Sequence, residues 1–292
     1  MAPATAPVIA DAPPPAPAGS SNPGVVVTPA GVVVPIVGGA PGAWKVRTPC
    51  GVDRSLGTGT RVGQATVVLD PGHGGAERGA ISPGGLAEAD VNLAVARRAR
   101  ATLEHQGISV VLTRTDDYRL ELTPRAMIAK DLNPRAFVSI HHNADPDGPR
   151  PTPGTETYYQ QSSADSKRLS GLLWEEVVHA LAGYKVGWVG DTDAGAKTRP
   201  GDHGDYYAVL REPAPVVSAL AELAFVSNPA EAELVGRPDV QAVEGDAVAR
   251  AIVRYLQTSD PGSGFTTAYP RPPNPPSTGP EAPPEVCVDP QL

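Results

Sequence analysis

The distribution of apolar residues along the chain predicts alternating strands and helices over its middle part. Four short runs rich in Val, Ile, Leu and Ala suit strands that are buried on both faces: residues 66–69, 108–113, 136–140 and 216–223. Four longer stretches carry apolar residues every three or four positions, as amphipathic helices do: about 89–106, 123–132, 164–181 and 240–256. Because such alternation favours right-handed crossovers, we expect an α/β fold, a single three-layer domain at 64–258 whose mostly parallel twisted sheet is flanked by helices.

The two ends of the chain differ from this middle part in composition. More than half of the 34 prolines lie in residues 1–35 and 259–292, where apolar content is too low to offset the entropy lost on ordering. We therefore expect residues 1–23 to be a flexible Pro/Ala-rich segment and residues 259–292 to be a Pro-rich tail. Within residues 24–63, two valine-rich runs across a proline turn predict a small N-terminal β-ribbon, followed by a Gly/Thr-rich link.

Charge and cysteine content narrow the partners and the compartment. A net charge of −8 gives no basic surface for nucleic acid, and no window approaches the roughly 18 consecutive apolar residues of a membrane-spanning helix. No signal peptide is recognisable, but residues 2–21 resemble the spacer after a removed signal, so we expect export to the periplasm or cell wall. We also expect the protein to be a monomer. Cys50 and Cys287 are the only cysteines, and an even pair predicts a disulfide, with two free thiols as the alternative.

Two of the predicted strands lead into imidazoles. His73 follows the first strand in a glycine-rich loop, and His141 follows the strand at 136–140. The carboxyl ends of parallel strands share one edge of a sheet, so these residues can converge, and Glu88 in the first turn of the next helix would add a carboxylate. Two imidazoles and a carboxylate are typical of catalytic zinc with a fourth position for water. A surface histidine and a glutamate that only balances the helix dipole are the ordinary alternatives.

Glu222 is the only charged residue in the apolar run at 216–223. A charge in a buried strand needs a partner or a function. Since zinc polarises a carbonyl and activates water, hydrolysis of an amide or ester is the expected chemistry. A carboxylate outside the metal ligands would carry a proton from water to the leaving nitrogen, and Glu222 is the candidate for that role.

Taken together, these motifs resemble the zinc-dependent N-acetylmuramoyl-L-alanine amidases of the type-3 (Amidase_3) family. The matching segments follow the family's order and cover about residues 65–257: 69–75, 85–88, 113–116 with Leu122 and Arg125, 139–143 and 222–228. The resemblance implies that Zn²⁺ is bound by His73, Glu88 and His141, and that Glu222 is the catalytic carboxylate. It also implies peptidoglycan as the substrate, cut between N-acetylmuramic acid and L-alanine of the stem peptide, during cell-wall remodelling or daughter-cell separation.

Some positions depart from the family pattern or are less specific. His142 stands where a small residue is usual, which leaves the ligating imidazole open, although the motif match favours His141 because neighbouring strand residues face opposite ways. Asn143, Arg125 and His203 are weaker candidates for a substrate groove. His203 belongs to a Gly/Asp-rich loop at 183–204, and a loop of that length often borders a site. His105 and His179 are expected on helix surfaces.

Two other functions stay open from the sequence. A catalytically silent peptidoglycan-binding or regulatory protein would keep this fold without turnover, and a zinc peptidase would cut the stem peptides. The presence of all four candidate residues disfavours the first, and the order of the motifs disfavours the second. Some family members carry an inhibitory helix after the histidine strand, but the proline-rich connection after Asn143 is too short for one. We therefore expect a groove that needs no release of such a helix.

Overall fold

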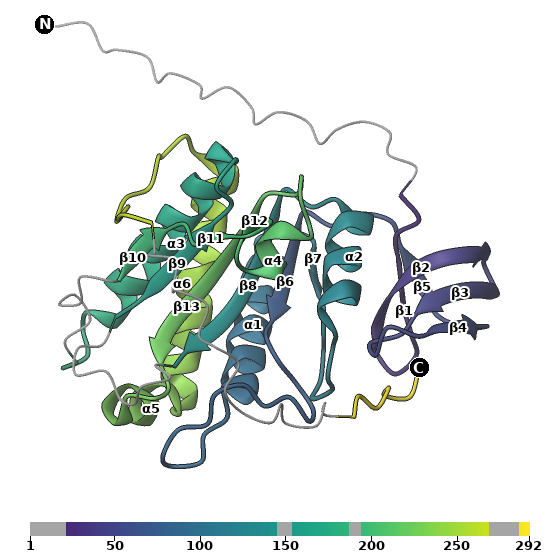
Figure 1. The fold of residues 1–292 in the computed structure, drawn as a ribbon, viewed down its shortest axis with the longest axis horizontal. Coiled ribbons are helices and arrows are strands. Elements are labelled where there is room, and N and C mark those ends of the chain that lie inside the picture. Colours follow the sequence, from purple (N-terminus) through teal and green to yellow (C-terminus); the bar gives the residue numbers. More distant parts are fainter. Residues whose placement is uncertain (1–21, 145–153, 187–193, 269–285) are drawn as a thin grey trace, which may run out of the picture.

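A six-stranded sheet forms the centre of the computed structural model, which describes residues 22–144, 154–186, 194–268 and 286–292 (Figure 1). The strand order is β10-β9-β13-β8-β6-β7. Its strands are β6 (Val67–Pro71), β7 (Val110–Leu112), β8 (Ala136–Asn143), β9 (Glu156–Tyr159), β10 (Gly195–Lys197) and β13 (Ser218–Phe225). Strands β13, β8, β6 and β7 are parallel to one another. Strand β9 runs antiparallel to β13, and β10 runs parallel to β9. The predicted mostly parallel sheet is confirmed.

Helices cover both faces of this sheet. On one face lie α1 (Glu88–His105), α3 (Ala164–Leu181), α5 (Pro229–Val235) and α6 (Pro238–Gln257), and on the other lie α2 (Leu122–Leu132) and α4 (Ala208–Arg211). Alternation along the strands creates the two cores: Val67 and Leu69 pack toward α1, whereas Val68 packs toward α2. The long helices lie within two residues of the bounds that their periodicity predicts, and the expected three-layer arrangement is confirmed.

The N-terminal region is more extensive than the predicted ribbon. Residues 25–62 form a five-stranded antiparallel sheet with the order β4-β3-β2-β1-β5. The strands are β1 (Val25–Val27), β2 (Val33–Ala40), β3 (Ala43–Arg47), β4 (Asp53–Leu56) and β5 (Thr60–Val62). The ribbon accounts only for β1 and β2, and the expected link contains β4 and β5. The physical reason is that Trp44, Val46 and Leu56 are buried in a hydrophobic core against this sheet. A ribbon of two strands is too small to cover these side chains.

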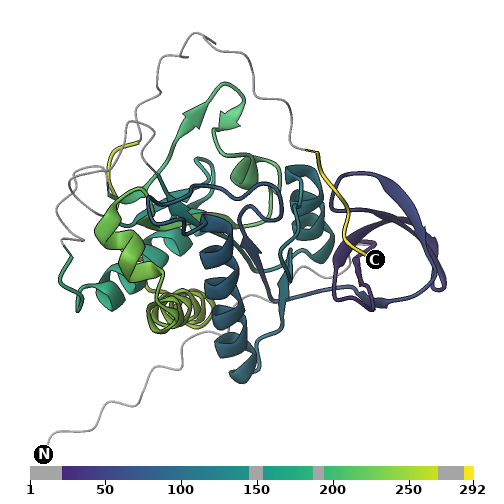
Figure 2. The same ribbon diagram turned by 90° about the horizontal axis from the view of Figure 1, so that it is seen from below.

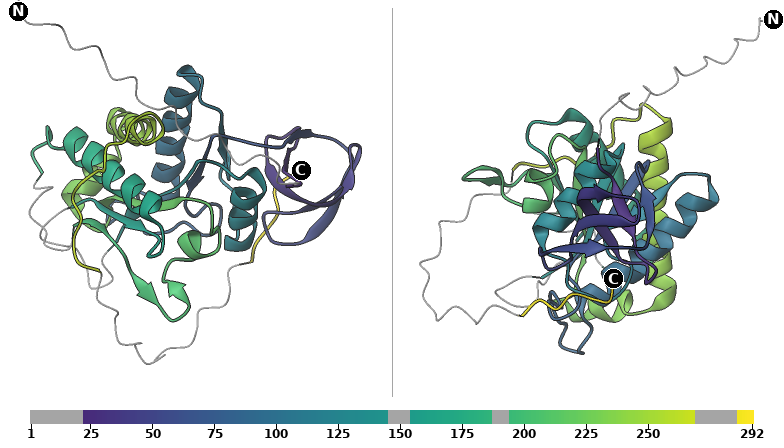
Figure 3. Two further views of the ribbon diagram at one scale, coloured as in Figure 1. Left: turned by 90° about the horizontal axis from the view of Figure 1, so that it is seen from above. Right: turned by 90° about the vertical axis from the view of Figure 1, so that its right-hand side faces the viewer.

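This five-stranded sheet lies at one end of the molecule, beside α2 (Figure 2). Its valines share one core with Ile128 and Leu132 of α2 and with Phe137 of β8. The C-terminal residues 286–292 lie against the same sheet (Figure 3). There Cys287 is bonded to Cys50, which confirms the predicted disulfide.

Part of the predicted C-terminal tail packs on the α/β domain. Phe265 forms a bridge with Ala196 and so continues the sheet beyond β10. A Cβ on Gly171 of α3 would lie 2.7 Å from the Phe265 ring, so α3 and this segment are in close contact. Residues 269–285 and 1–21 lie outside the described residues, as do residues 145–153, so the expected lack of an inhibitory helix there stays a prediction. Among the helices that the structure describes, none is long and apolar enough to cross a membrane.

Candidate metal centre and active site

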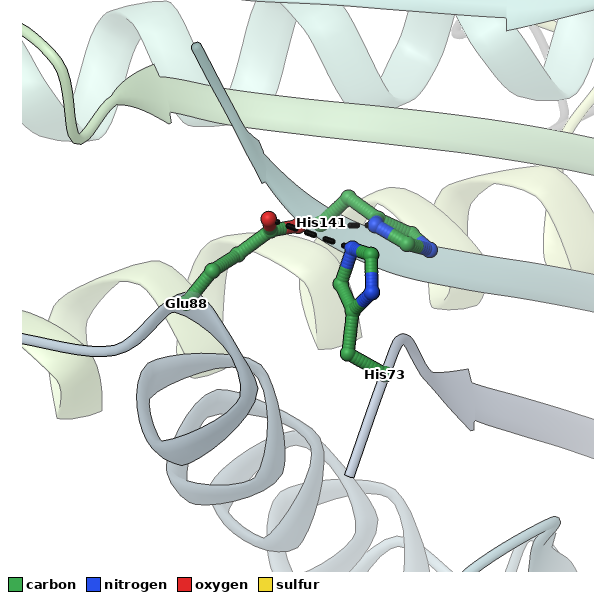
Figure 4. Close-up of side chains that lie close together, drawn as sticks. All are labelled: His73, Glu88 and His141. Carbon is green, nitrogen blue, oxygen red and sulfur yellow. Dashed lines mark hydrogen bonds and ion pairs between the residues drawn. The ribbon is translucent and has the colours of Figure 1, made fainter. Parts of the chain in front are cut away.

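Three side chains from three elements converge at the carboxyl edge of the parallel strands (Figure 4). His73 follows β6, Glu88 is the first residue of α1, and His141 belongs to β8. His73 Nε2 lies 3.1 Å from Glu88 Oε2, and His141 Nδ1 lies 2.8 Å from Glu88 Oε1. One ligand atom from each residue lies within 4.8 Å of the others. The sequence predicted this set of residues, and the structure brings all three together.

His73 is held in an uncommon backbone conformation. Its φ of 60° lies in the left-handed region, which costs free energy for a residue other than glycine. Arg125 Nη2 donates a hydrogen bond to the His73 carbonyl at 2.8 Å, and the His73 ring bonds Glu77 through Nδ1 at 3.0 Å. When Nδ1 donates this hydrogen bond to Glu77, the neutral ring carries its lone pair on Nε2. This lone pair faces Glu88 and can bind a metal.

Two glycines leave the space that this cluster occupies. A Cβ on Gly72 would lie 2.1 Å from the His141 ring. A Cβ on Gly79 would lie 2.5 Å from Glu88 Oε2 and 2.6 Å from the His73 ring, and Gly79 also has a φ of +68°. Any larger residue at either position would displace a member of the cluster. The glycines of this loop therefore have a steric reason to be there.

A buried ion pair fixes the base of the His73 loop. Arg125 Nη1 lies 2.7 Å from Asp70 Oδ1, and the hydroxyl groups of Thr113 and Ser139 also donate to this carboxylate. Burial alone would raise the pKa of Asp70, but the charge of Arg125 and these hydrogen bonds lower it overall. Arg125, a predicted groove residue, is only 3% exposed, and its guanidinium donates hydrogen bonds to Asp70 and to the carbonyls of Leu120, Pro71 and His73. A contact between Arg125 and substrate stays a prediction.

The charges in the cluster suit a cation. Burial would raise the pKa of Glu88, but hydrogen bonds with His141 and His73 hold it well below its usual range. Burial lowers the pKa of His141. Burial also opposes protonation of His73, but hydrogen bonds with Glu77 and Glu88 raise the His73 pKa to about 9. Binding of a metal ion by these residues would therefore release the His73 proton.

Glu222 lies in the same row of the sheet as His141. In the register of the strands, Glu222 of β13 is opposite His141 on one side and opposite Glu156 on the other, so the three side chains share a face. Glu222 is 8% exposed, and its Oε2 accepts no hydrogen bond from any residue that the structure describes. Burial raises the pKa of Glu222 well above its usual value, and the negative charges of Glu88 and Glu156 add to this effect.

One cavity of about 530 Å³ lies at this edge of the sheet. His73, His141 and Glu222 contribute to its surface together with two segments, residues 119–122 at the start of α2 and residues 206–209 at the start of α4. His203, another predicted groove residue, lies in an exposed turn between β11 (Pro200–Gly201) and β12 (Gly204–Asp205) and is not among the lining residues. The cavity therefore combines a possible metal centre with a buried carboxylate.

Sequence analysis did not single out the network beside Glu222. Glu156 is buried, and its Oε1 lies 2.8 Å from Lys197 Nζ. Its Oε2 accepts hydrogen bonds from Asn143 Nδ2 at 2.7 Å and from the Tyr158 hydroxyl at 3.0 Å. Asn143, predicted to line a groove, thus holds Glu156 in place. The only signal in the sequence was Glu222, the lone charge in the apolar run at 216–223. Its position does not reveal the neighbouring Glu156 and Lys197.

Strand alternation separates the two neighbouring histidines. His141 faces the cavity, whereas His142 lies on the opposite face of the sheet, where its Nδ1 lies 2.8 Å from Asn92 of α1. His142 is fully buried there. Of the two imidazoles that the sequence left open, only His141 lies within reach of His73.

Comparisons with known proteins agree with this arrangement. Residues 67–254 match the Amidase_3 model, described as N-acetylmuramoyl-L-alanine amidase. The uncharacterized protein YqiI of Bacillus subtilis is 32% identical over 218 residues, which are 73% of this chain and 97% of that protein. The N-acetylmuramoyl-L-alanine amidase AmiC of Neisseria meningitidis is 30% identical over 245 residues, covering 70% of this chain and 55% of AmiC.

A solved structure extends the likeness to three dimensions. The crystal structure of an N-acetylmuramoyl-L-alanine amidase from Clostridium difficile aligns with 68% of this chain and 100% of that chain, at 30% identity and a TM-score of 0.58. The family match begins at β6 and therefore leaves the five-stranded N-terminal sheet outside it.

Proposed function

Since the chain belongs to the N-acetylmuramoyl-L-alanine amidase family, we propose that it is a zinc-dependent peptidoglycan hydrolase. It would cleave the amide between N-acetylmuramic acid and L-alanine of the stem peptide. His73, Glu88 and His141 would hold the zinc, and Glu222 would act as acid and base. The observation that carries the proposal is that His73 and His141, the two imidazoles of the His, Glu, His cluster, line one cavity together with the buried Glu222 carboxylate.

The donor set of the cluster fits zinc. Imidazole nitrogen and carboxylate oxygen are the usual ligands of catalytic zinc, which takes three protein ligands and keeps one position open. A Cβ on Gly72 or Gly79 would clash with the cluster, so these two glycines leave the room that the cluster needs. A zinc ion held there would polarise the carbonyl of the scissile amide and favour the attack of water.

Glu222 would carry the proton of the reaction. As the water oxygen bonds to the carbonyl carbon, the carboxylate takes a proton from that water, and it returns the proton to nitrogen as the C–N bond breaks. Burial and the neighbouring charge of Glu156 raise the proton affinity of Glu222, which suits a group that must keep the proton between these two events. The positive charge of a bound metal ion would act in the opposite direction and favour the ionised form that starts the cycle.

We also propose that the protein works outside the cytosol, as a monomer. A disulfide such as Cys50–Cys287 persists in oxidising compartments, and peptidoglycan lies in the periplasm or cell wall. With that substrate, its role would be cell-wall remodelling or the separation of daughter cells.

Two measurements test this proposal. Metal analysis of the purified protein should find one zinc per chain, and mass spectrometry of digested peptidoglycan should find stem peptides that begin with a free L-alanine amino group. Release of D-alanine would identify a zinc peptidase instead. Binding to peptidoglycan without any new amino terminus would identify a catalytically silent wall-binding protein.

A further inference from the structure

A second polar cluster lies on the face of the sheet opposite the cavity. It consists of Asn92 of α1, His142 of β8 and Glu244 of α6, and each of the three is 0% exposed. The elements that carry them, α1, β8 and α6, contribute to one hydrophobic core, and burying a carboxylate and an imidazole costs free energy unless they are paired. The reaction proposed above uses none of the three.

Hydrogen bonds connect this cluster with the metal centre. Asn92 Nδ2 donates to Glu88 Oε1 and to the Gly72 carbonyl, both at 3.3 Å. Its Oδ1 is therefore the atom that faces His142 Nδ1 at 2.8 Å, and because an amide oxygen only accepts, His142 Nδ1 must donate. The backbone N–H of His142 also donates to Glu88 Oε1 at 3.2 Å. Asn92 and His142 thus hold the same oxygen of the proposed metal ligand.

Glu244 faces the other nitrogen of the His142 ring. His142 Nε2 lies 3.5 Å from Glu244 Oε1, an ion-pair distance that is longer than a hydrogen bond. Neither carboxylate oxygen of Glu244 has a hydrogen-bond partner among the described residues. Glu244 has this position because α6 lies very close to α1: a Cβ on the adjacent Gly245 would lie 2.6 Å from Arg98 Cβ. The carboxylate is therefore directed at His142 from the neighbouring helix.

The other oxygen of Glu88 is held from a different direction. Glu88 Oε2 accepts a hydrogen bond from the Ala80 N–H at 2.9 Å. The orientation of the Glu88 carboxylate thus depends on two sets of donors, the Ala80 amide on Oε2 and the buried cluster on Oε1. Rotation of this carboxylate away from His73 and His141 would break both sets.

We propose that Asn92, His142 and Glu244 are positioning residues, which hold the Glu88 carboxylate in its metal-binding orientation and thereby raise the affinity of the site for zinc. The inference rests on the proposed zinc site and adds to it. Loss of a hydrogen-bond partner behind a metal ligand typically weakens metal binding by about 10- to 100-fold.

The test is the zinc affinity of single variants, measured by competition with a chelator at fixed pH. Because the backbone N–H of His142 stays in place and both side chains act on Glu88 only through Asn92, we expect His142→Ala and Glu244→Leu to bind zinc about 10-fold more weakly, at the lower end of this range. Glu244→Gln should stay close to the wild type, because its amide can donate to His142 Nε2. Asp246→Ala is the matched control: it removes a carboxylate from the same helix, bonded to Arg98 and Thr102, without touching the cluster. Circular dichroism with excess chelator shows whether each metal-free variant is folded.

Asn92→Ala provides a second route if either core variant does not fold. It removes the donor to Glu88 directly and places a helix-favouring residue in α1. Wild-type zinc affinity in the folded variants would overturn the inference. So would an equal loss in Asp246→Ala, because that would trace the effect to the stability of α6. A wild-type protein that binds no zinc would overturn this inference and the proposed zinc site together, whereas zinc binding without amidase products would overturn only the proposed reaction.

Discussion

Glu222 and Asp70 are two buried carboxylates of the same sheet with opposite surroundings. Asp70 is paired with Arg125 and two hydroxyl groups, whereas Glu222 Oε2 has no hydrogen-bond partner among the described residues. Their pKa values accordingly shift in opposite directions, down for Asp70 and up for Glu222. The paired carboxylate stabilises the fold, and the unpaired one is the group that is available for proton transfer.

The unpaired carboxylate should be needed for turnover but not for metal binding. Glu222→Gln keeps the shape of the side chain but cannot accept a proton, so we expect hydrolysis to fall by about 10²–10⁴-fold. Zinc content should stay at the wild-type level, because Glu222 is not part of the ligand cluster. Hydrolysis rates and metal analysis of the same preparation check both statements. Full turnover in the variant, or loss of its zinc, would remove Glu222 from this role.

The paired carboxylate should make stability depend on acid pH. The pKa of Asp70 is lower in the folded chain than in the unfolded chain, so its stabilising effect is fully present above the unfolded value of about 3.9 and is lost as pH falls through the folded value. Asp70→Asn should destabilise the fold by about 3–5 kcal/mol at pH 7, since it leaves Arg125 buried without its partner. Urea unfolding at several pH values should show a smaller further loss below pH 4 in the variant than in the wild type.

Strands β9 and β10 are joined by a buried ion pair as well as by their backbone. Lys197→Met would leave Glu156 buried without its cation, and we expect a loss of about 3–5 kcal/mol in the free energy of unfolding. The double variant with Glu156→Gln should recover part of this loss, because no unpaired charge is left behind. Chemical denaturation of both variants measures the difference. Equal stability of the single variant and the wild type would contradict the stabilising role of this pair.

The disulfide links the N-terminal sheet to the C-terminal segment across 237 residues. Replacing both cysteines with serine should lower stability by up to about 5 kcal/mol in the chain-entropy model, because the unfolded chain gains freedom. Thermal unfolding of the double variant beside the oxidised wild type gives the size of the effect. Thiol titration of the unreduced, unfolded wild type should find no free thiol, and two thiols per chain would contradict the bridge.

At the scale of the whole molecule, the N-terminal sheet and the catalytic domain share one core. Val25, Val26 and Val34 pack in the same cluster as Ile128 and Phe137. A chain that begins at residue 64 would expose this apolar surface, and we expect it to aggregate rather than to fold. Solubility and circular dichroism test the truncated chain. Calorimetry of the full chain should show one cooperative transition, whereas two separate transitions would indicate that the sheet folds independently.

Local patterns were sufficient to predict much of this protein. Each long helix could be recognised from its own periodicity, and the central strands from their apolar runs. The convergence of His73 and His141 could also be predicted, because parallel strands bring their carboxyl ends to one edge whatever the loops between them. Glu88 was predicted for a similar reason, since it opens the helix that follows the His73 loop.

Contacts between distant segments were decided only by the tertiary structure. Nothing in the local sequence pairs Glu156 with Lys197 or directs Glu244 toward His142, because each pair comes from elements whose relative position depends on packing. The five-stranded sheet was underestimated for the same reason: β4 and β5 carry few apolar residues and are stabilised by pairing with their neighbours. The sequence by itself therefore determined the long helices, the central strands and the proposed ligand set. The elements follow from local patterns, and the ligand set follows from the shared edge at which parallel strands end. Only the tertiary structure decided which buried charges meet, because burial and pairing arise when separate elements pack together.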